Sequence, residues 1–253
     1  MKFSANLGFL WTDRPLPDRI QAAKAAGFHA VECHLPYQTN PALIKAALVE
    51  TGLPMLGINT DFGDTAAGEF GLAALPGREA DARRVIDQAI AYAAEIEAQN
   101  VHVLAGNASG SVALDTFKKN LSVAAEKAAE HGINILIEPL NPHSNPGYFL
   151  NHSNMAADII QELNLPNLKL MFDCYHIQMI EGNLLNRAIE LMPMIGHIQF
   201  AGVPGRQEPN IGEINYRWLL PQLVEGGYTG YFGAEYRPKA TVEAGLGWIS
   251  EYA

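Results

Sequence analysis

Three carboxylates and one amide each follow a short apolar run in the second half of the chain. They are Glu138, Asp173, Gln199 and Glu235. Runs this apolar are typical of strands buried on both faces of a parallel sheet. Pro139 would end the first run, because proline has no backbone donor for the sheet ladder. Since parallel strands end at a shared edge, we expect the four side chains to meet there.

Oxygen donors of this kind suit a hard divalent cation such as Mg²⁺ or Mn²⁺. A buried charge is unfavourable unless it is compensated, so four oxygen donors at matching strand ends favour a metal site over four unrelated caps or ion pairs. Softer metals prefer cysteine or several histidines. A zinc site is therefore less favoured, although His176 and His197 leave it open.

Glu138 and Glu235 also suit proton transfer. Moving a carbonyl between adjacent carbons requires removing a proton from one carbon and returning one to the other through an enediolate. Two carboxylates can exchange these roles, and a divalent ion would stabilise the enediolate charge. We predict that one glutamate abstracts the proton while the other, or its conjugate acid, delivers one.

Four further side chains are candidates for substrate binding. His176 lies three residues after Asp173 and is predicted to hydrogen-bond a substrate oxygen, with a bond to loop carbonyls as the alternative. Arg206, in a loop rich in glycine and proline, is predicted to clamp a substrate carboxylate bidentately. Arg78 is the alternative for that task, and Asn107 is a candidate pocket-wall residue.

Two other polar residues are interpreted as structural. Glu32 is embedded in a predicted strand, with a supporting role at the site as the alternative. His197 is interpreted as a strand histidine rather than a ligand.

The elements that would position these residues alternate regularly along the chain. Strands are predicted over 3–7, 30–35, 53–59, 101–105, 133–138, 168–173, 195–201 and 231–236. Helices are predicted over 15–26, 41–50, 79–98, 112–131, 154–163, 182–191, 216–225 and 241–252. Between 60 and 77 several glycines and a proline break the pattern, as in a functional lid or binding loop.

Eight alternating strand–helix units in 253 residues favour one closed (β/α)₈ TIM barrel spanning 1–253. An open doubly wound sheet would carry a glycine-rich nucleotide-binding turn after its first strand. Residues 8–13 contain neither that glycine pattern nor a phosphate-binding lysine.

The composition of the chain indicates which kinds of partner to expect. The formal net charge is -10 and the 17 Lys and Arg are scattered, so we expect no nucleic-acid binding. No apolar run approaches the ~20 residues that span a bilayer. Cys33 and Cys174 are expected to be buried thiols in a reducing compartment. With no signal-peptide pattern, a cytoplasmic location is predicted, and homo-oligomerisation is left open.

Five motifs carry a resemblance to a known family. They are Ile-Glu-Pro-Leu-Asn at 137–141, Phe-Asp-Cys-Tyr-His at 172–176, His-Ile-Gln-Phe-Ala at 197–201, Gly-Ala-Glu-Tyr at 233–236 and Gly-Leu-Ala-Ala-Leu-Pro-Gly-Arg-Glu at 71–79. Together they resemble the hydroxypyruvate isomerase family, over essentially the whole chain. Its wider relatives are the xylose-isomerase-like barrels, which include ketose 3-epimerases and endonuclease-IV-type repair enzymes.

The resemblance implies a (β/α)₈ isomerase of carbohydrate and glyoxylate metabolism that interconverts hydroxypyruvate and tartronate semialdehyde (2-hydroxy-3-oxopropanoate). The residues matching Glu138 and Glu235 serve in that family as proton donor and acceptor. Metal-bound relatives use the same two with the positions of Asp173 and Gln199.

Several alternatives stay open. Within the class, the substrate could be a four-carbon 2-oxo-tetronate. The ketose 3-epimerases typically have histidine where this chain has Gln199. The endonuclease-IV-like metal hydrolases hold three zinc ions with many more histidines, and the acidic charge here disfavours DNA. A non-catalytic sugar-binding module would not need the paired glutamates.

Overall fold

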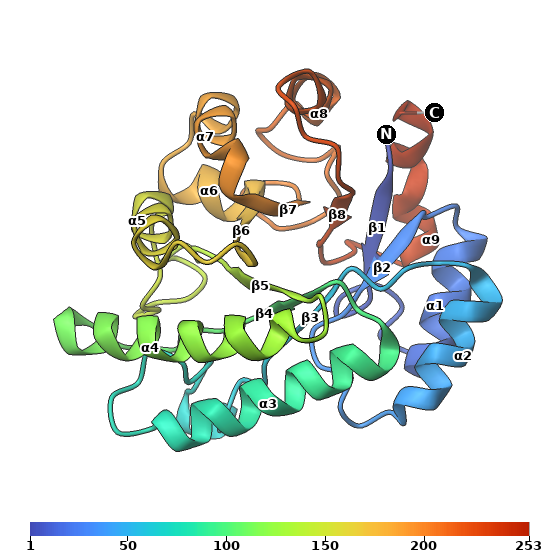
Figure 1. Ribbon diagram of the computed structural model, residues 1–253. Helices are drawn as coiled ribbons and strands as arrows, with labels where there is room; N and C mark the ends of the chain where they lie inside the picture. The colour runs from blue at the N-terminus through green and yellow to red at the C-terminus, as the bar shows by residue number, and fades with distance from the viewer. Residues whose placement is uncertain (253) are drawn as a thin grey trace.

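The computed structural model describes residues 1–252, in which eight parallel strands alternate with helices along the chain (Figure 1). The strands are β1 (Phe3–Asn6), β2 (Ala30–Glu32), β3 (Gly57–Asn59), β4 (Asn100–His102), β5 (Asn134–Ile137), β6 (Leu168–Asp173), β7 (Ile195–Phe200) and β8 (Phe232–Ala234). They run in the spatial order β2-β1-β8-β7-β6-β5-β4-β3.

The sheet closes between its two end strands, β2 and β3. The backbone N–H of Val31 donates to the carbonyl of Pro54 at 3.0 Å, and the N–H of Leu56 returns a bond to Val31 at 2.7 Å. The N–H of Cys33 then donates to Gly57 at 3.0 Å. The predicted (β/α)₈ barrel is confirmed.

Helices surround the strands on the outside (Figure 1). The α-helices are α1 (Leu16–Ala25), α2 (Pro41–Thr51), α3 (Glu79–Ile96), α4 (Gly110–Ala129), α5 (Ser153–Leu163), α6 (Cys174–Ile180), α7 (Leu184–Leu191), α8 (Tyr216–Glu225) and α9 (Val242–Gly245). Short 3₁₀ turns are η1 (Thr65–Ala67), η2 (Met192–Met194) and η3 (Leu246–Tyr252).

Two of these segments differ from prediction. Helix α6 follows β6 without a loop because Asp173 caps it: the Asp173 carboxylate accepts the backbone N–H of Tyr175 at 2.8 Å. The segment 241–252, predicted as one closing helix, is a single α-helical turn followed by a 3₁₀ helix.

An aromatic cluster fixes this last segment against the start of the barrel. The Trp248 side chain is fully buried, and its ring centroid lies 5.1 Å from that of Phe3 and 5.4 Å from that of Phe200. The first and last segments of the chain therefore lie side by side (Figure 1).

The predicted irregular loop at 60–77 lies against the end of β4. Gly71 pairs with Ala105 in an antiparallel bridge, and the N–H of Ala74 donates to the carbonyl of Ala105 at 2.7 Å. Gly106 has φ +90°, and a Cβ there would lie 2.2 Å from the Gly71 carbonyl oxygen. The close approach of the two backbones thus requires glycine.

Two expectations from composition have structural counterparts. Both cysteines, Cys33 and Cys174, are buried free thiols. Across residues 1–252, no helix has the length and apolar character needed to span a membrane.

Candidate active site

A cavity of about 540 Å³ opens at the carboxyl ends of the strands, where barrel enzymes place their active sites. Glu138 and Glu235 both line it, as do Arg206 and His176. The remaining charged or ring side chains in its wall include Phe9, His34, Phe62, Phe70, His102, His143, Tyr175 and Arg237.

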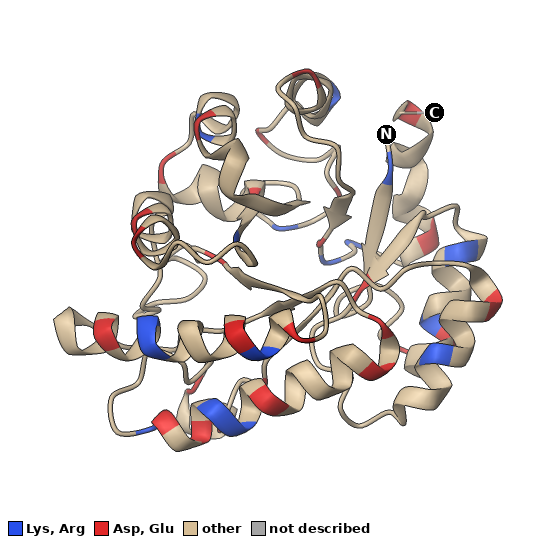
Figure 2. Cartoon of the chain, in the orientation of Figure 1, with Lys and Arg blue, Asp and Glu red and all other residues tan. Residues whose placement is uncertain are grey.

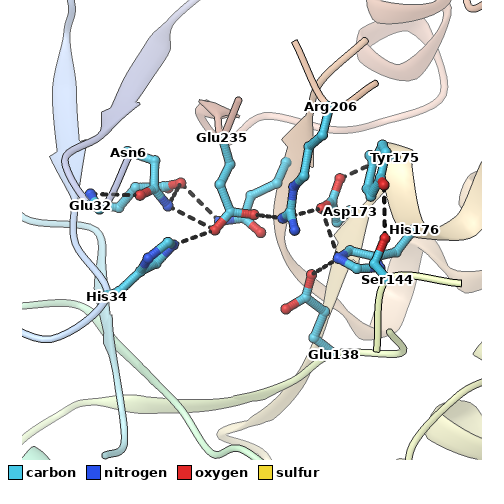
Figure 3. Close-up of polar contacts among 12 residues, drawn as sticks. Asn6, Glu32, His34, Glu138, Ser144, Asp173, Tyr175, His176, Arg206 and Glu235 are labelled. Carbon is cyan, nitrogen blue, oxygen red and sulfur yellow. Dashed lines mark hydrogen bonds and ion pairs between the residues drawn. The ribbon is translucent and has the colours of Figure 1, made fainter. Parts of the chain in front are cut away.

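Three donors surround the Glu235 carboxylate (Figure 3). Asn6 Nδ2 donates to it at 3.0 Å, His34 Nε2 lies 2.7 Å away, and Arg206 Nη2 contacts its other oxygen. Burial would raise the pKa of Glu235, but the Arg206 charge and the His34 hydrogen bond outweigh burial and lower it to about 2. Glu235 is therefore an anion at neutral pH.

Glu138 has the opposite environment. It is buried, and its Oε1 atom has no hydrogen-bond partner among the described residues. The nearest ring nitrogens are His102 Nδ1, 3.7 Å from Oε2, and His176 Nε2, 4.0 Å from Oε1. Burial, followed by the negative charges of Glu235 and Asp173, raises the pKa of Glu138 well above its usual value. Glu138 therefore binds a proton more readily than an exposed glutamate does.

Asp173 and Arg206 form an ion pair at the carboxyl end of β6. Arg206 Nη2 lies 3.2 Å from Asp173 Oδ2 and bridges it to Glu235 (Figure 3). Burial raises the pKa of Asp173 to about 7, although the Arg206 charge opposes this. Arg206 also lies over the Tyr175 ring, with 4.9 Å from the guanidinium carbon to the ring centroid. The positive charge of Arg206 thus balances negative charge on Asp173 and Glu235, two of the predicted metal ligands.

Gln199, the fourth predicted ligand, is oriented by Glu32. Gln199 Nε2 donates to Glu32 Oε1 at 2.9 Å, whereas the amide oxygen of Gln199 is buried without a partner. His197 Nε2 lies 2.6 Å from the other Glu32 oxygen, and Ser4 and Asn6 also donate to this carboxylate. We call Ser4, Asn6, Glu32, His197 and Gln199 the Glu32 cluster. In this cluster the NH₂ group of Gln199 is hydrogen-bonded, so the amide oxygen is the end of the side chain that remains available to a ligand.

His176 is set up as a hydrogen-bond donor. Its Nδ1 atom accepts the backbone N–H of Asn141 at 2.9 Å, so the proton of a neutral ring resides on Nε2. Burial, followed by the Arg206 charge, lowers the pKa of His176 well below its usual value, which keeps the ring neutral. Although Glu138, Asp173 and His176 present atoms within 4.8 Å of one another, a protonated Nε2 donates to an oxygen rather than ligating a metal.

The four predicted oxygen donors are of the kind that binds a hard divalent cation, although among them only Glu138 and Glu235 line the cavity. Glu138 Oε1 and Gln199 Oε1 are both buried without a partner, and a cation would supply what each lacks. Asp173 and Glu235 add two carboxylates already held against a positive group. A set composed of three carboxylates and one amide oxygen matches Mg²⁺ or Mn²⁺ better than zinc.

Two predicted substrate-binding residues lie elsewhere. Arg78 precedes α3 and pairs with Glu69 and with Asp81, whose Oδ2 lies 2.6 Å from its Nε. Asn107 is exposed and donates to the carbonyl of Gly68 at 3.3 Å. In the part of the chain that the structure describes, neither residue lines the cavity.

Four contributing residues were not among the predicted site residues: Asn6, His34, His102 and Arg237. Asn6 is the last residue of β1, so the strand-end pattern that identified Glu138 also marks it. His102 is the last residue of β4, but it lies near the start of the strand predicted over 101–105. His102 is fully buried, both of its ring nitrogens lack a partner among the described residues, and burial lowers its pKa to about 3. It presents a neutral ring beside Glu138.

Comparisons with known proteins support the barrel fold. Residues 20–252 match the family described as xylose isomerase-like TIM barrel. The chain is 45% identical to the 2-oxo-tetronate isomerase of Cupriavidus necator, over 99% of this chain and 98% of that one. It is 36% identical to the hydroxypyruvate isomerase of Escherichia coli K12, over 100% and 99% respectively.

Among solved structures, one from Brucella melitensis described as an AP endonuclease of family 2 superimposes with a TM-score of 0.95. It is 37% identical, over 99% of this chain and 98% of that one.

Proposed function

Because this chain belongs to the xylose isomerase-like TIM barrel family, we propose that it interconverts hydroxypyruvate and 2-hydroxy-3-oxopropanoate through an enediolate. Relatives named as isomerases match it over their full length, which makes it an enzyme of the aldose–ketose isomerase type. We propose the identity of the substrate and the mechanism from the cavity described above.

The observation that carries the proposal is the contrast between the two glutamates in one cavity. Glu235 is stabilised as an anion by Asn6, His34 and Arg206. Glu138 is buried beside two neutral histidines with an oxygen free of hydrogen bonds. Two carboxyl groups whose surroundings separate their pKa values are suited to act as base and acid on one substrate.

The proposed reaction starts at C3 of hydroxypyruvate. The Glu235 carboxylate accepts a proton from C3, a C2–C3 double bond forms, and O2 takes the negative charge. The Glu138 acid delivers a proton to C2 while the hydroxyl proton passes from O3 to O2, giving the aldehyde. The reverse reaction exchanges the two roles.

Two side chains support the enediolate oxygen in this proposal. His176 Nε2–H and the Arg206 guanidinium both face the space between the glutamates (Figure 3), where each can donate to developing negative charge. We further propose that Glu138, Asp173, Gln199 and Glu235 hold Mg²⁺ or Mn²⁺, which when bound supplies positive charge against the enediolate.

A second candidate within the same class is a four-carbon 2-oxo-tetronate. The relative from Cupriavidus necator that is named for this substrate is 45% identical, and the cavity of about 540 Å³ leaves room beyond a three-carbon acid. One added methylene changes discrimination by only ~1–3 kcal/mol, so the mechanism would be the same for both acids.

The test is a coupled assay on hydroxypyruvate and on a 2-oxo-tetronate, with EDTA and with added Mg²⁺ or Mn²⁺. We expect turnover of at least one acid, and loss of activity in EDTA if the cation is required. Turnover of neither acid would refute the proposal.

Glu138→Gln and Glu235→Gln should each lower kcat by ~10²–10⁴-fold, because each removes a proton-transfer group while keeping the side-chain shape. Glu126→Gln, on the exposed side of α4, is the matched control. Full activity in either cavity variant would contradict the assigned roles.

A further inference from the structure

Arg237 is a second guanidinium at the cavity, two residues beyond Glu235. It lines the cavity and is exposed to solvent. Within residues 1–252, its side chain makes no ion pair and donates no hydrogen bond. It is therefore a positive charge at the cavity without an anionic partner.

The other arginine of the cavity is already engaged. Arg206 Nη2 is shared by Asp173 and Glu235, so two protein carboxylates offset its charge. A substrate that itself carries a carboxylate enters a cavity lined by Glu138 and Glu235. Its negative charge needs a further cation, and Arg237 supplies one without breaking an existing pair.

The position of Arg237 is set by Phe9 and by the neighbouring loop. The guanidinium carbons of Arg206 and Arg237 each lie 5.3 Å from the centroid of the Phe9 ring. The backbone N–H of Arg237 donates to the carbonyl of Arg206 at 2.7 Å. The two arginines therefore occupy one rim of the cavity, with Arg206 inside at the acids and Arg237 outside in contact with solvent.

We propose that Arg237 binds the carboxylate of the substrate and selects 2-oxo acids over neutral hydroxyketones. The inference rests on the proposed function and deepens it: Glu138 and Glu235 act on the reacting carbons, and Arg237 holds the end that does not react. Arg206 is then left to the oxo oxygen.

The test compares ligands that differ only in the charged end. Pyruvate and hydroxyacetone are titrated calorimetrically into wild type, Arg237→Gln, Arg237→Lys and Lys239→Gln. Lys239 is the matched control, because it is an exposed cation of the same loop that does not line the cavity. Arg237→Gln should raise the Kd of pyruvate by about 10–100-fold and leave that of hydroxyacetone unchanged. Arg237→Lys should restore part of the loss.

Kinetics give a second readout. Arg237→Gln should raise KM for hydroxypyruvate by a similar factor with kcat within about 3-fold of wild type, since the carboxylate contact is the same in the ground and transition states. With dihydroxyacetone, which replaces the carboxylate by a hydroxymethyl group, the variant should match wild type. The ratio of kcat/KM for hydroxypyruvate to kcat/KM for dihydroxyacetone should therefore be smaller in Arg237→Gln than in wild type.

Three outcomes would overturn the proposal: equal pyruvate affinity in wild type and Arg237→Gln, an equal loss in Lys239→Gln, or no pyruvate binding by wild type. Pyruvate binding that depends on Arg237, without turnover of either oxo acid, would instead refute the proposed reaction and leave the carboxylate site standing.

Discussion

Glu138 and Glu235 are the same side chain in two different surroundings. Three donors reach Glu235, while Glu138 faces ring nitrogens at 3.7 and 4.0 Å. A hydrogen bond to the charged form lowers a carboxyl pKa, and burial without one raises it. The difference between the two pKa values is therefore made by neighbouring residues from β1, the segment after β2 and the Arg206 loop.

The raised pKa of a buried acid leads to a first prediction, which concerns how the stability of the protein depends on pH. The pKa of Asp173 is raised to about 7 in the folded protein, while an unfolded aspartate ionises near pH 4. Between pH 5 and 7 the folded state thus binds more protons than the unfolded state. The free energy of unfolding should therefore fall as pH rises through this window, by up to about 1.4 kcal/mol per pH unit for each such group.

Urea unfolding at pH 5, 6 and 7 in EDTA measures this slope. Asp173→Asn should flatten it, because the amide does not titrate, whereas Asp158→Asn on the exposed side of α5 should not. An unchanged slope in Asp173→Asn would count against the raised pKa.

A second prediction concerns Glu32, which holds Asn6 and Gln199 by hydrogen bonds of 3.2 and 2.9 Å. In Glu32→Gln the carboxylate that accepts these bonds is replaced by an amide, and the Gln199 amide loses its fixed orientation. Mutation of a residue that orients metal ligands typically lowers metal affinity by about 10–100-fold. We expect Mn²⁺ affinity, measured calorimetrically, to fall by about 10-fold or more.

A purely structural Glu32 would give a different result. Glu32→Gln would then lower the melting temperature and leave Mn²⁺ affinity unchanged at temperatures where the protein is folded. Glu50→Gln, at an exposed end of α2, serves as the control for removing one acid.

At the scale of elements, the cavity wall depends on how the 60–77 loop is fastened to β4. The rings of Phe62 and Phe70 stack within this loop, with 4.7 Å between their centroids, and both side chains line the cavity. The loop is held where Gly71 and Gly106 approach backbone to backbone. The loop is thus fixed by main-chain contacts, and a single methyl group at Gly106 would push it away.

Gly106→Ala should therefore destabilise the protein by ~1–3 kcal/mol and raise KM by displacing the aromatic wall. Gly27→Ala is the matched control. Gly27 has φ +86°, close to the +90° of Gly106, but a Cβ there meets nothing within 4 Å. Thermal unfolding and steady-state kinetics measure both effects, and equal KM changes in the two variants would contradict a role for the loop contact.

The regular elements could be predicted because their signals are local. Apolar runs ending in an acid marked β5, β6 and β8, and helical spacing marked α1 to α4. Helix α6 was missed, since no loop separates it from β6 and its cap is Asp173, which had been assigned only to the site. The predicted roles of Asp173 and Gln199 remain predictions.

The supporting residues could not be predicted, because their contacts join distant parts of the chain. Asn6 and Glu235 are 229 residues apart along the sequence and hydrogen-bonded in space. His34 and Glu235 are separated by 201 residues. Only the spatial order of the strands, which places β1 between β2 and β8, shows that these side chains share a partner.

At the scale of the whole molecule, the net charge of -10 limits which large partners can approach. Lys and Arg lie interspersed with Asp and Glu along the outer helices α1 to α4 (Figure 2). Duplex binding requires a clustered basic face that neutralises phosphates.

We therefore predict no cleavage of a duplex containing an abasic site, and no shift of that duplex in a gel at physiological salt. This holds despite the 37% identity to the Brucella melitensis protein described as an AP endonuclease. Cleavage that is lost in Glu138→Gln would show that the cavity acts on DNA and would reopen the hydrolase alternative.

The place of β8 in the sheet, between β1 and β7, has a consequence during synthesis on the ribosome. The residues of β1, β2 and β5 emerge long before β8, yet the cavity has no Glu235 and no Arg237 until that strand inserts. Until then β1 and β7 also present open edges to other chains. An unfinished chain therefore lacks a complete cavity, and two of its strand edges stay open to pairing with other chains until its last strand is made.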